Sequence, residues 1–209
     1  MTDPDRSGAT RHSDEAVAPS EQGVHQDPPA PVERLTTRVV YANRWMTVRE
    51  DEVRFPGGHR GIYGVVEKAD FALVVPWDGS GLHMVRQFRY PTGAAHWEFP
   101  QGSAEEGGRT PEALARGELK EETGLSAGHM VPLGFLYQAN GYSDQGFHVF
   151  LATDLAPGER RLEATELGMQ TAVFSVAEFE AMLRRGDVRD GPTVAAYGLL
   201  RLHGTLEGA

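Results

Sequence analysis

From Thr36 onward the sequence is patterned as short runs of alternating or continuous apolar residues, which is typical of β-strands. Turn signals such as Pro56-Gly57-Gly58 and Asp78-Gly79-Ser80-Gly81 separate these runs. The runs before residue 91 are TTRVVYAN, RWMTVREDEVRF, GIYGVVEK, FALVVPW and LHMVRQFRY. They predict that an antiparallel sheet system begins at about Thr36.

A helix is predicted over residues 111–123 by the signals at its two ends. Thr110 suits the N-cap, Pro111 suits the first helical position, and Gly124 suits the position at which a helix stops. Two more strand-like runs, VPLGFLYQA and FHVFLATDL, follow this helix. The helix therefore interrupts a series of strands.

Two further helices are expected towards the end of the chain. Ser175-Val176-Ala177-Glu178 has the spacing of a capping box, and the helix that it opens is expected to stop near Gly186. The last helix is expected from about Pro192 to His203. Strands interrupted by one helix and followed by two more predict an α+β fold, or a layered sandwich of helices on a mixed sheet.

The composition changes along the chain and divides it into three parts. Residues 1–35 are rich in Pro, Ser, Asp, Glu and Gln and nearly free of large apolar side chains, so we expect a disordered tail. Residues 36–68 form an N-terminal β segment. Residues 69–209 contain the helices and the remaining strands, and we interpret them as one domain of ordinary size.

The overall charge and the missing residue types narrow the function. With 30 acidic and 20 basic residues the formal charge is -10, which disfavours attraction to nucleic acid or to an anionic membrane. The chain has no cysteine, which excludes disulfides, thiolate metal sites and thiol nucleophiles. It also has no leader-like start and no apolar run near the roughly 20 residues of a membrane span. We therefore expect a cytoplasmic protein with a small-molecule partner.

Three glutamates of the predicted helix over 111–123 share one face. At 100° per residue Glu118, Glu121 and Glu122 project within an arc of roughly 100°. A solvated acidic face is the ordinary explanation of such a cluster. However, anions in the last turns of a helix are disfavoured by its dipole, by about 0.3 to 1 kcal/mol each, and only Lys120 lies among them. A divalent cation would remove this penalty, and oxygen ligands suit Mg²⁺ or Mn²⁺.

The stretch from Gly102 to Leu125, GSAEEGGRTPEALARGELKEETGL, resembles the Nudix box. That pattern is G-x5-E-x7-R-E-U-x-E-E-x-G-U, where U is apolar. The end of the stretch, ELKEETGL, carries the specific part of the match. The resemblance implies a Nudix-type α/β/α sandwich with a mixed sheet, preceded here by the N-terminal β segment, and it implies hydrolysis of a diphosphate bond.

The same resemblance assigns roles to residues of the predicted helix and of the loop before it. Glu118 and Glu122 match metal ligands, and Glu121 matches a carboxylate that binds metal directly or through water. Gln101 matches a position whose backbone carbonyl completes the metal shell. The implied cofactor is Mg²⁺, with Mn²⁺ as the alternative ion.

Two positions depart from the Nudix pattern. Gly117 stands where the pattern has an arginine before Glu118. The loop after Gly102 is one residue longer, so that Arg109 stands where the pattern has its first glutamate. Either Arg109 or Arg116 substitutes for the missing arginine, or the site is weakened. A catalytically silent sensor that binds nucleotide sugars is therefore an alternative to an enzyme.

Similarity outside the box favours the ADP-ribose pyrophosphatase branch of the family. The matching pieces, in chain order, are Asn43-Arg44-Trp45, Val53 to Gly58, Arg86 to Pro91, Glu98 to Gly102, and Gly141 to Leu155. The resemblance implies hydrolysis of ADP-ribose, to AMP and ribose 5-phosphate, or of a related nucleoside diphosphate sugar. A dinucleoside polyphosphate or capped RNA end is a further alternative substrate.

Substrate and base residues follow from the same resemblance. Arg86 and Arg89 are expected near the substrate or a dimer interface, although strand alternation places them on opposite faces. Glu98 is expected close to the ribose or the metal. The family's mobile catalytic glutamate best matches Glu166 and then Glu163, either of which could deprotonate a water molecule.

The N-terminal β segment predicts a homodimer. It holds more large apolar side chains than a small two-faced hairpin on one sheet edge can cover. In the resembling branch such a segment contributes to a two-fold dimer, so we expect the segment of each chain to cover the other and to help build its active site. The alternative is that the segment packs entirely on its own catalytic domain.

Overall fold

The computed structural model describes residues 31–103, 108–162 and 166–206. Residues 1–30 of the predicted disordered tail lie outside these ranges, whereas residues 33–35 at its end belong to strand β1. The elements in chain order are β1 (Glu33–Ala42), β2 (Thr47–Arg54), β3 (Arg60–Glu67), β4 (Phe71–Pro76), β5 (Leu82–Arg89), the 3-10 turn η1 (Tyr90–Thr92), β6 (Ala94–Glu98), β7 (Gln101–Ser103), α1 (Pro111–Thr123), β8 (Leu125–Tyr137), β9 (Gly146–Pro157), β10 (Gln170–Phe174), α2 (Val176–Arg185) and α3 (Gly191–His203).

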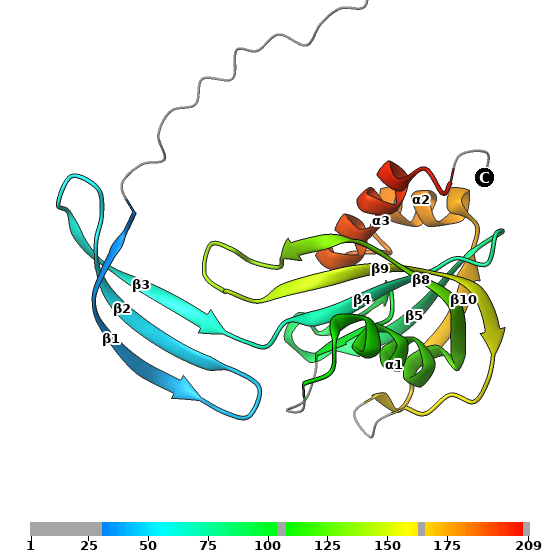
Figure 1. Cartoon of the computed structure of the whole chain (residues 1–209), viewed down its shortest axis with the longest axis horizontal. Coiled ribbons are helices and arrows are strands. Elements are labelled where there is room, and N and C mark those ends of the chain that lie inside the picture. The colour runs from blue at the N-terminus through cyan, green and yellow to red at the C-terminus, as the bar shows by residue number, and fades with distance from the viewer. Residues whose placement is uncertain (1–30, 104–107, 163–165, 207–209) are drawn as a thin grey trace, which may run out of the picture. The chain divides into compact units, whose positions relative to one another are not determined.

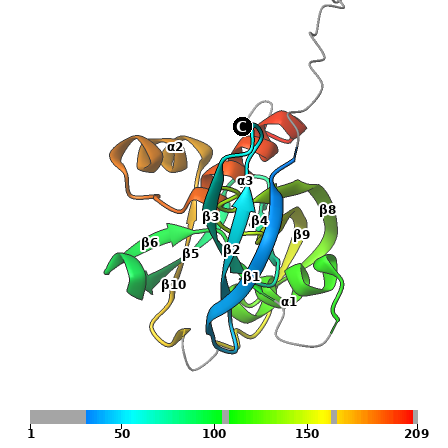
Figure 2. The ribbon, with the colours of Figure 1, turned by 90° about the vertical axis from the view of Figure 1, so that its left-hand side faces the viewer.

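The strands of the described residues form three sheets. β1, β2 and β3 make an antiparallel meander with β2 in the middle, here called the N-terminal sheet (Figure 2). A mixed sheet has the order β7-β4-β9-β8, in which β4 and β9 are parallel and the other pairs are antiparallel. The third sheet has the order β10-β5-β6. The predicted mixed sheet is thus confirmed.

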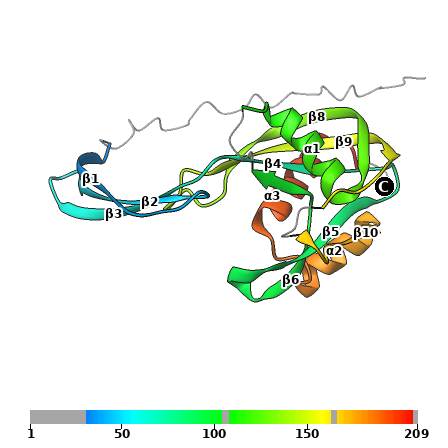
Figure 3. The ribbon, with the colours of Figure 1, turned by 90° about the horizontal axis from the view of Figure 1, so that it is seen from below.

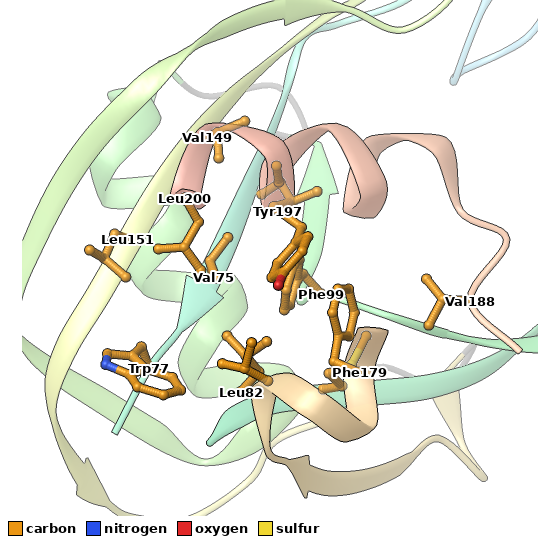
Figure 4. Close-up of a cluster of buried hydrophobic side chains, with 14 of the residues drawn as sticks. Val75, Trp77, Leu82, Phe99, Val149, Leu151, Phe179, Val188, Tyr197 and Leu200 are labelled. Atoms are coloured by element: carbon orange, nitrogen blue, oxygen red, sulfur yellow. The ribbon is translucent and has the colours of Figure 1, made fainter. Parts of the chain in front are cut away.

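Strand β4 is buried along its whole length and separates two hydrophobic cores. Its odd-numbered residues, such as Leu73 and Val75, pack into a core that includes Phe179 of α2 and Leu200 of α3 (Figure 4). Its even-numbered residues Ala72 and Val74 instead pack with residues of α1. Since side chains alternate across a strand, a wholly apolar strand needs a cover on both faces. The result is the expected α/β/α sandwich, with α1 and α3 on different sides of β4 (Figure 3).

The predicted helix ends are confirmed. The Thr110 hydroxyl accepts a hydrogen bond from the Ala113 backbone, and Gly124 ends α1 with a φ of 77°. The capping box at Ser175 opens α2, which ends at Gly186. The last helix begins at Gly191, one residue before the predicted start, with Asp190 as its N-cap.

Strands β6, β7 and β10 were not predicted. β7 has only three residues and includes Gly102, and the other two are five residues long. Such short segments give too little alternation to stand out from a loop. β10 and β6 nevertheless form the two edges of the sheet around β5, and β7 connects the mixed sheet to the start of the Nudix-like stretch.

The N-terminal sheet contributes no residue to either hydrophobic core of the described residues. Near the end of β3, the Val66 backbone N–H donates to the carbonyl of Tyr142 at 2.8 Å, and the Ser143 hydroxyl donates to the carbonyl of Val66 at 2.7 Å. Figure 1 shows β1, β2 and β3 as a sheet of their own. Its large apolar side chains that remain exposed are Val39, Val40, Tyr41, Ile62 and Tyr63, together with Trp45 in the turn after β1.

No helix among the described residues is both long enough and apolar enough to cross a membrane.

Candidate active site

The three predicted carboxylates lie in the last two turns of α1. Glu122 is 1% exposed, whereas Glu118 and Glu121 are half-buried. The backbone N–H of Gln101 donates to Oε2 of Glu122 at 3.2 Å, which attaches β7 to the helix. The fold therefore brings Gln101 beside Glu122, while the role of the Gln101 carbonyl stays a prediction.

Gly102 leaves the space that the carboxylate of Glu118 occupies. A Cβ atom built on Gly102 would overlap the carboxyl carbon and both carboxyl oxygens of Glu118. Real Cβ atoms do not approach other atoms so closely, so any larger residue at this position would displace the carboxylate. The glycine that opens the Nudix-like stretch is thus required by the position of Glu118.

Residues 98–101 are anchored on both sides. The Phe99 N–H donates to the hydroxyl of buried Thr193 in α3 at 2.9 Å, and the Pro100 carbonyl accepts from Val74 of β4 at 2.9 Å. The Phe99 ring stacks on Phe179 of α2 with the centroids 5.6 Å apart. Since Glu98 and Gln101 flank this anchored pair, their backbone positions are fixed by the core of the protein.

Glu98 is buried and is bound by two side chains. Nε of Arg89 donates to its two carboxylate oxygens at 3.0 and 3.1 Å, and Nε2 of Gln101 donates at 3.1 Å. The Gln101 amide also donates to Oδ2 of Asp190 at 3.2 Å. Burial lowers the pKa of Arg89, but hydrogen bonding to Glu98 and the charges of Glu98, Asp190 and Glu122 raise it more. The guanidinium therefore stays charged beside the carboxylates.

The pKa of Glu122 is raised well above its usual value. Burial is the largest cause, followed by the negative charges of Glu118 and Glu166, while the Gln101 N–H and the charge of Arg89 oppose the rise. The carboxylates thus outweigh the cations around Glu122. A divalent cation would offset this excess of negative charge.

The donor set fits a hard cation that keeps part of its water. Its side-chain donors are carboxylate oxygens, and the space left at Gly102 holds the carboxylate of Glu118 towards β7. No group of three or more His, Asp or Glu residues in the described ranges is assembled closely enough to hold an ion alone. Mg²⁺ needs no such cage, because it is commonly bound by one or two carboxylates together with waters and substrate phosphates.

Arg160 attaches the loop that contains the two candidate bases to the end of α1. Its Nε donates to the carbonyl of Glu122, and its Nη1 donates to the carbonyl of Met169 at 2.9 Å. The backbone of Arg161 donates to the carbonyl of Glu121 at 3.1 Å. This attachment keeps Glu166 close enough to act electrostatically on Glu122. The other candidate base, Glu163, lies outside the described residues.

Arg86 lies apart from the carboxylates, on the other face of β5. It lines a cavity of about 570 Å³ together with His96, Trp97, Gln170 and Arg189. Trp97 packs against the core of α2 and α3, whereas Arg89 points to Glu98. The alternation expected for Arg86 and Arg89 is therefore confirmed, and the structure does not bring the two arginines together.

Two residues of the site were missed by the sequence analysis. Asp190 binds Gln101 and caps α3, where its Oδ2 accepts from the Thr193 N–H at 2.9 Å. The order Asp190, Gly191, Pro192 is an N-cap signal that could have drawn attention to it. Arg160 had no comparable signal, because its partners are backbone carbonyls distant in sequence.

Comparison with known families identifies the class of protein that this fold and site define. Residues 32–66 match the nucleoside diphosphate sugar hydrolase N-terminal domain, and residues 68–197 match the NUDIX domain. The second match spans more than half of the chain. The chain belongs to the Nudix family and is a Nudix hydrolase.

Individual relatives lie in the same branch. The chain is 32% identical to an ADP-ribose pyrophosphatase of Mycobacterium tuberculosis over 84% of its own length and 85% of that protein. It is 27% identical to an ADP-ribose pyrophosphatase of Bacillus subtilis, over 80% of this chain and 91% of the relative. A solved structure described as an ADP compounds hydrolase superposes with a TM-score of 0.77, covers 88% of this chain and 99% of its own, and is 23% identical. That likeness supports the fold.

Proposed function

We propose that the protein is a Mg²⁺-dependent pyrophosphohydrolase that cleaves ADP-ribose or a related nucleoside diphosphate sugar. The observation that carries the proposal is the approach of Glu118 and Glu122 to Gly102 and Gln101, beside the pair of Arg89 and Glu98. The two relatives called ADP-ribose pyrophosphatase support this substrate class. With ADP-ribose the products would be AMP and ribose 5-phosphate.

Each residue of the site has a role in this proposal. Glu118, Glu122 and the Gln101 carbonyl would hold the cation, as would Glu121, directly or through water. A bound divalent ion supplies charge that stabilises the diphosphate and makes water more acidic. Water attacks one phosphorus, the bond from that phosphorus to the bridging oxygen breaks, and the bridging oxygen leaves with the other phosphate. Glu166 or Glu163 takes the proton of the water, with Glu121 as the remaining candidate.

Arg89 would bind the substrate while it holds Glu98. Its side chain is 40% exposed although Nε and Nη2 both donate to Glu98, so part of the side chain remains accessible to a phosphate. Arg86 has a different position, and its part in substrate binding stays a prediction. The variant Arg86→Ala tests whether Arg86 also binds the substrate. An unchanged KM would show that it does not.

We also propose that the active molecule is a homodimer in which the N-terminal sheets cover one another's apolar side chains. Ile62 is 65% exposed and Val39 is 63% exposed, although both belong to strands. Large apolar side chains exposed on strands are stabilised when a second surface covers them, and the N-terminal sheet of a partner chain would provide such a surface.

A panel of nucleotide sugars tests the proposed activity. Each compound is incubated with Mg²⁺ and the enzyme, and alkaline phosphatase then releases inorganic phosphate only from cleaved products. We expect release from ADP-ribose or a close analogue and none after chelation of the metal. Binding of a nucleotide sugar by calorimetry without any product would instead favour the sensor. Cleavage confined to dinucleoside polyphosphates or capped RNA would favour the third hypothesis.

A further inference from the structure

Gly117 lies in the interior of α1, where glycine is unfavourable relative to alanine. Its backbone is not in the left-handed region that favours glycine, so the conformation does not require it. The residue is half-buried and directly precedes Glu118. The reason for a glycine at this position must therefore lie in what surrounds it.

The guanidinium of Arg109 lies against Gly117. A Cβ atom built on Gly117 would be 3.2 Å from Nη1 of Arg109, which is tighter than nine in ten Cβ contacts and would require the guanidinium to shift. The same point is 3.7 Å from Oε1 of Glu121. Arg109 comes directly before the N-cap Thr110. Its side chain extends along α1 to Gly117, the residue before Glu118.

Arg116, the other candidate, is bound elsewhere. Its Nε donates to Oε1 of Glu112 at 2.9 Å, and its Nη1 donates to the carbonyl of Ala127 at 2.8 Å. Arg116 is therefore held by partners of its own, although it is the immediate neighbour of Gly117. Of the two arginines that the sequence offered, Arg109 is therefore the one whose guanidinium lies beside Gly117.

We infer that Arg109 is a positioning residue that supplies the positive charge beside Glu121, and that Gly117 leaves the space for it. The two departures from the Nudix pattern are then one compensated change, since the arginine missing at 117 is replaced by the arginine at 109. A cation there offsets the repulsion among Glu118, Glu121 and Glu122 by its charge. The inference rests on the proposed hydrolase site.

An exchange of the two positions tests the inference. Arg109→Glu and Gly117→Arg, as single variants, each lower kcat by roughly 10- to 100-fold, the usual cost of losing a partner that orients a ligand. The double variant R109E/G117R restores the pattern of the family and regains at least about a third of wild-type kcat. Arg109→Lys keeps the charge and loses less than Arg109→Ala. A double variant no faster than the slower single variant overturns the inference.

A second measurement uses the substrate-free protein and does not depend on turnover. The dissociation constant for Mn²⁺ is measured by electron paramagnetic resonance in R109E and in the matched control R116E. Because R109E puts a further carboxylate beside Glu121, we expect it to bind Mn²⁺ about threefold to tenfold tighter than wild type, although it turns over more slowly. R116E should change the constant by less than about twofold, because Arg116 lies with Glu112.

The outcomes of the two measurements are distinguishable. A wild-type protein that cleaves no nucleotide sugar refutes the proposed function, while the Mn²⁺ comparison still tests the position of Arg109. Equal Mn²⁺ constants in R109E and R116E refute the inference even if the enzyme is active. Tighter Mn²⁺ binding together with recovery of kcat in the double variant supports it.

Discussion

The N-terminal sheet and the mixed sheet differ in what covers them. In β4 of the mixed sheet every residue is buried, because α1 lies on one face and α2 and α3 lie on the other. In β1 of the N-terminal sheet nearly every residue is exposed, although the strand holds Val39, Val40 and Tyr41. An apolar strand pattern therefore predicts a sheet, but it does not say whether the same chain provides the cover.

The largest expected difference between the two regions is in the cost of removing an apolar side chain. Leu73 of β4 is fully buried, and Leu73→Ala should lower the free energy of unfolding by about 2–5 kcal/mol. Ile62 of β3 is 65% exposed within its own chain, so Ile62→Ala should cost less than about 1 kcal/mol at a protein concentration at which the proposed dimer is dissociated. Urea unfolding of the two variants makes the comparison. Equal costs would mean that the N-terminal sheet has a cover within its own chain.

A charge on the face of the N-terminal sheet that carries Ile62 should break the dimer. Ile62→Glu is expected to shift the mass seen by light scattering from dimer to monomer, and to lower kcat/KM by tenfold or more if the partner's sheet helps to build the site. Leu202→Glu is the matched control, because Leu202 of α3 is 87% exposed and lies outside the N-terminal sheet. A monomeric wild type with full activity would rule out the shared site.

The smallest effect is expected at the start of α1. Thr110→Ala removes the hydroxyl that accepts from Ala113 and should destabilise the protein by about 1 kcal/mol in thermal or urea unfolding. Thr110→Ser keeps the hydroxyl and should recover most of this stability. If both variants unfold like wild type, the cap contributes nothing to the free energy of unfolding, and α1 is stabilised by its core contacts alone.

The parts of the fold that were predicted correctly depend on local signals. Thr110, Ser175 and Gly124 act through backbone groups a few residues away, so the sequence contains the whole interaction. Strand β7 has no such signal, since its pairing with β4 involves residues about thirty positions apart. The edges of the sheets therefore had to come from the structure.

The same distinction holds for the candidate site. The shared face of Glu118, Glu121 and Glu122 follows from helical spacing alone. The contacts of Asp190 with Gln101 and of Arg160 with Glu122 depend on how distant segments pack, and neither was predicted. The sequence left open whether Arg109 or Arg116 replaces the missing arginine or the site is weakened, and the observation that favours Arg109 is the distance of 3.2 Å from the Cβ position of Gly117 to Nη1 of Arg109.

The central claim is that the carboxylates at the end of α1 catalyse hydrolysis of a diphosphate, and a comparison within this helix tests it most directly. AMP formed from ADP-ribose is followed by chromatography in Mg²⁺ for wild type, Glu122→Gln and Glu112→Gln. Glu122 is buried among the other carboxylates, whereas Glu112 is exposed in the first turn. We expect Glu122→Gln to reduce the rate about a thousandfold, which corresponds to a loss of several kcal/mol of transition-state stabilisation. We expect the rate of Glu112→Gln to stay within about twofold of wild type. Equal rates in all three proteins would contradict the account.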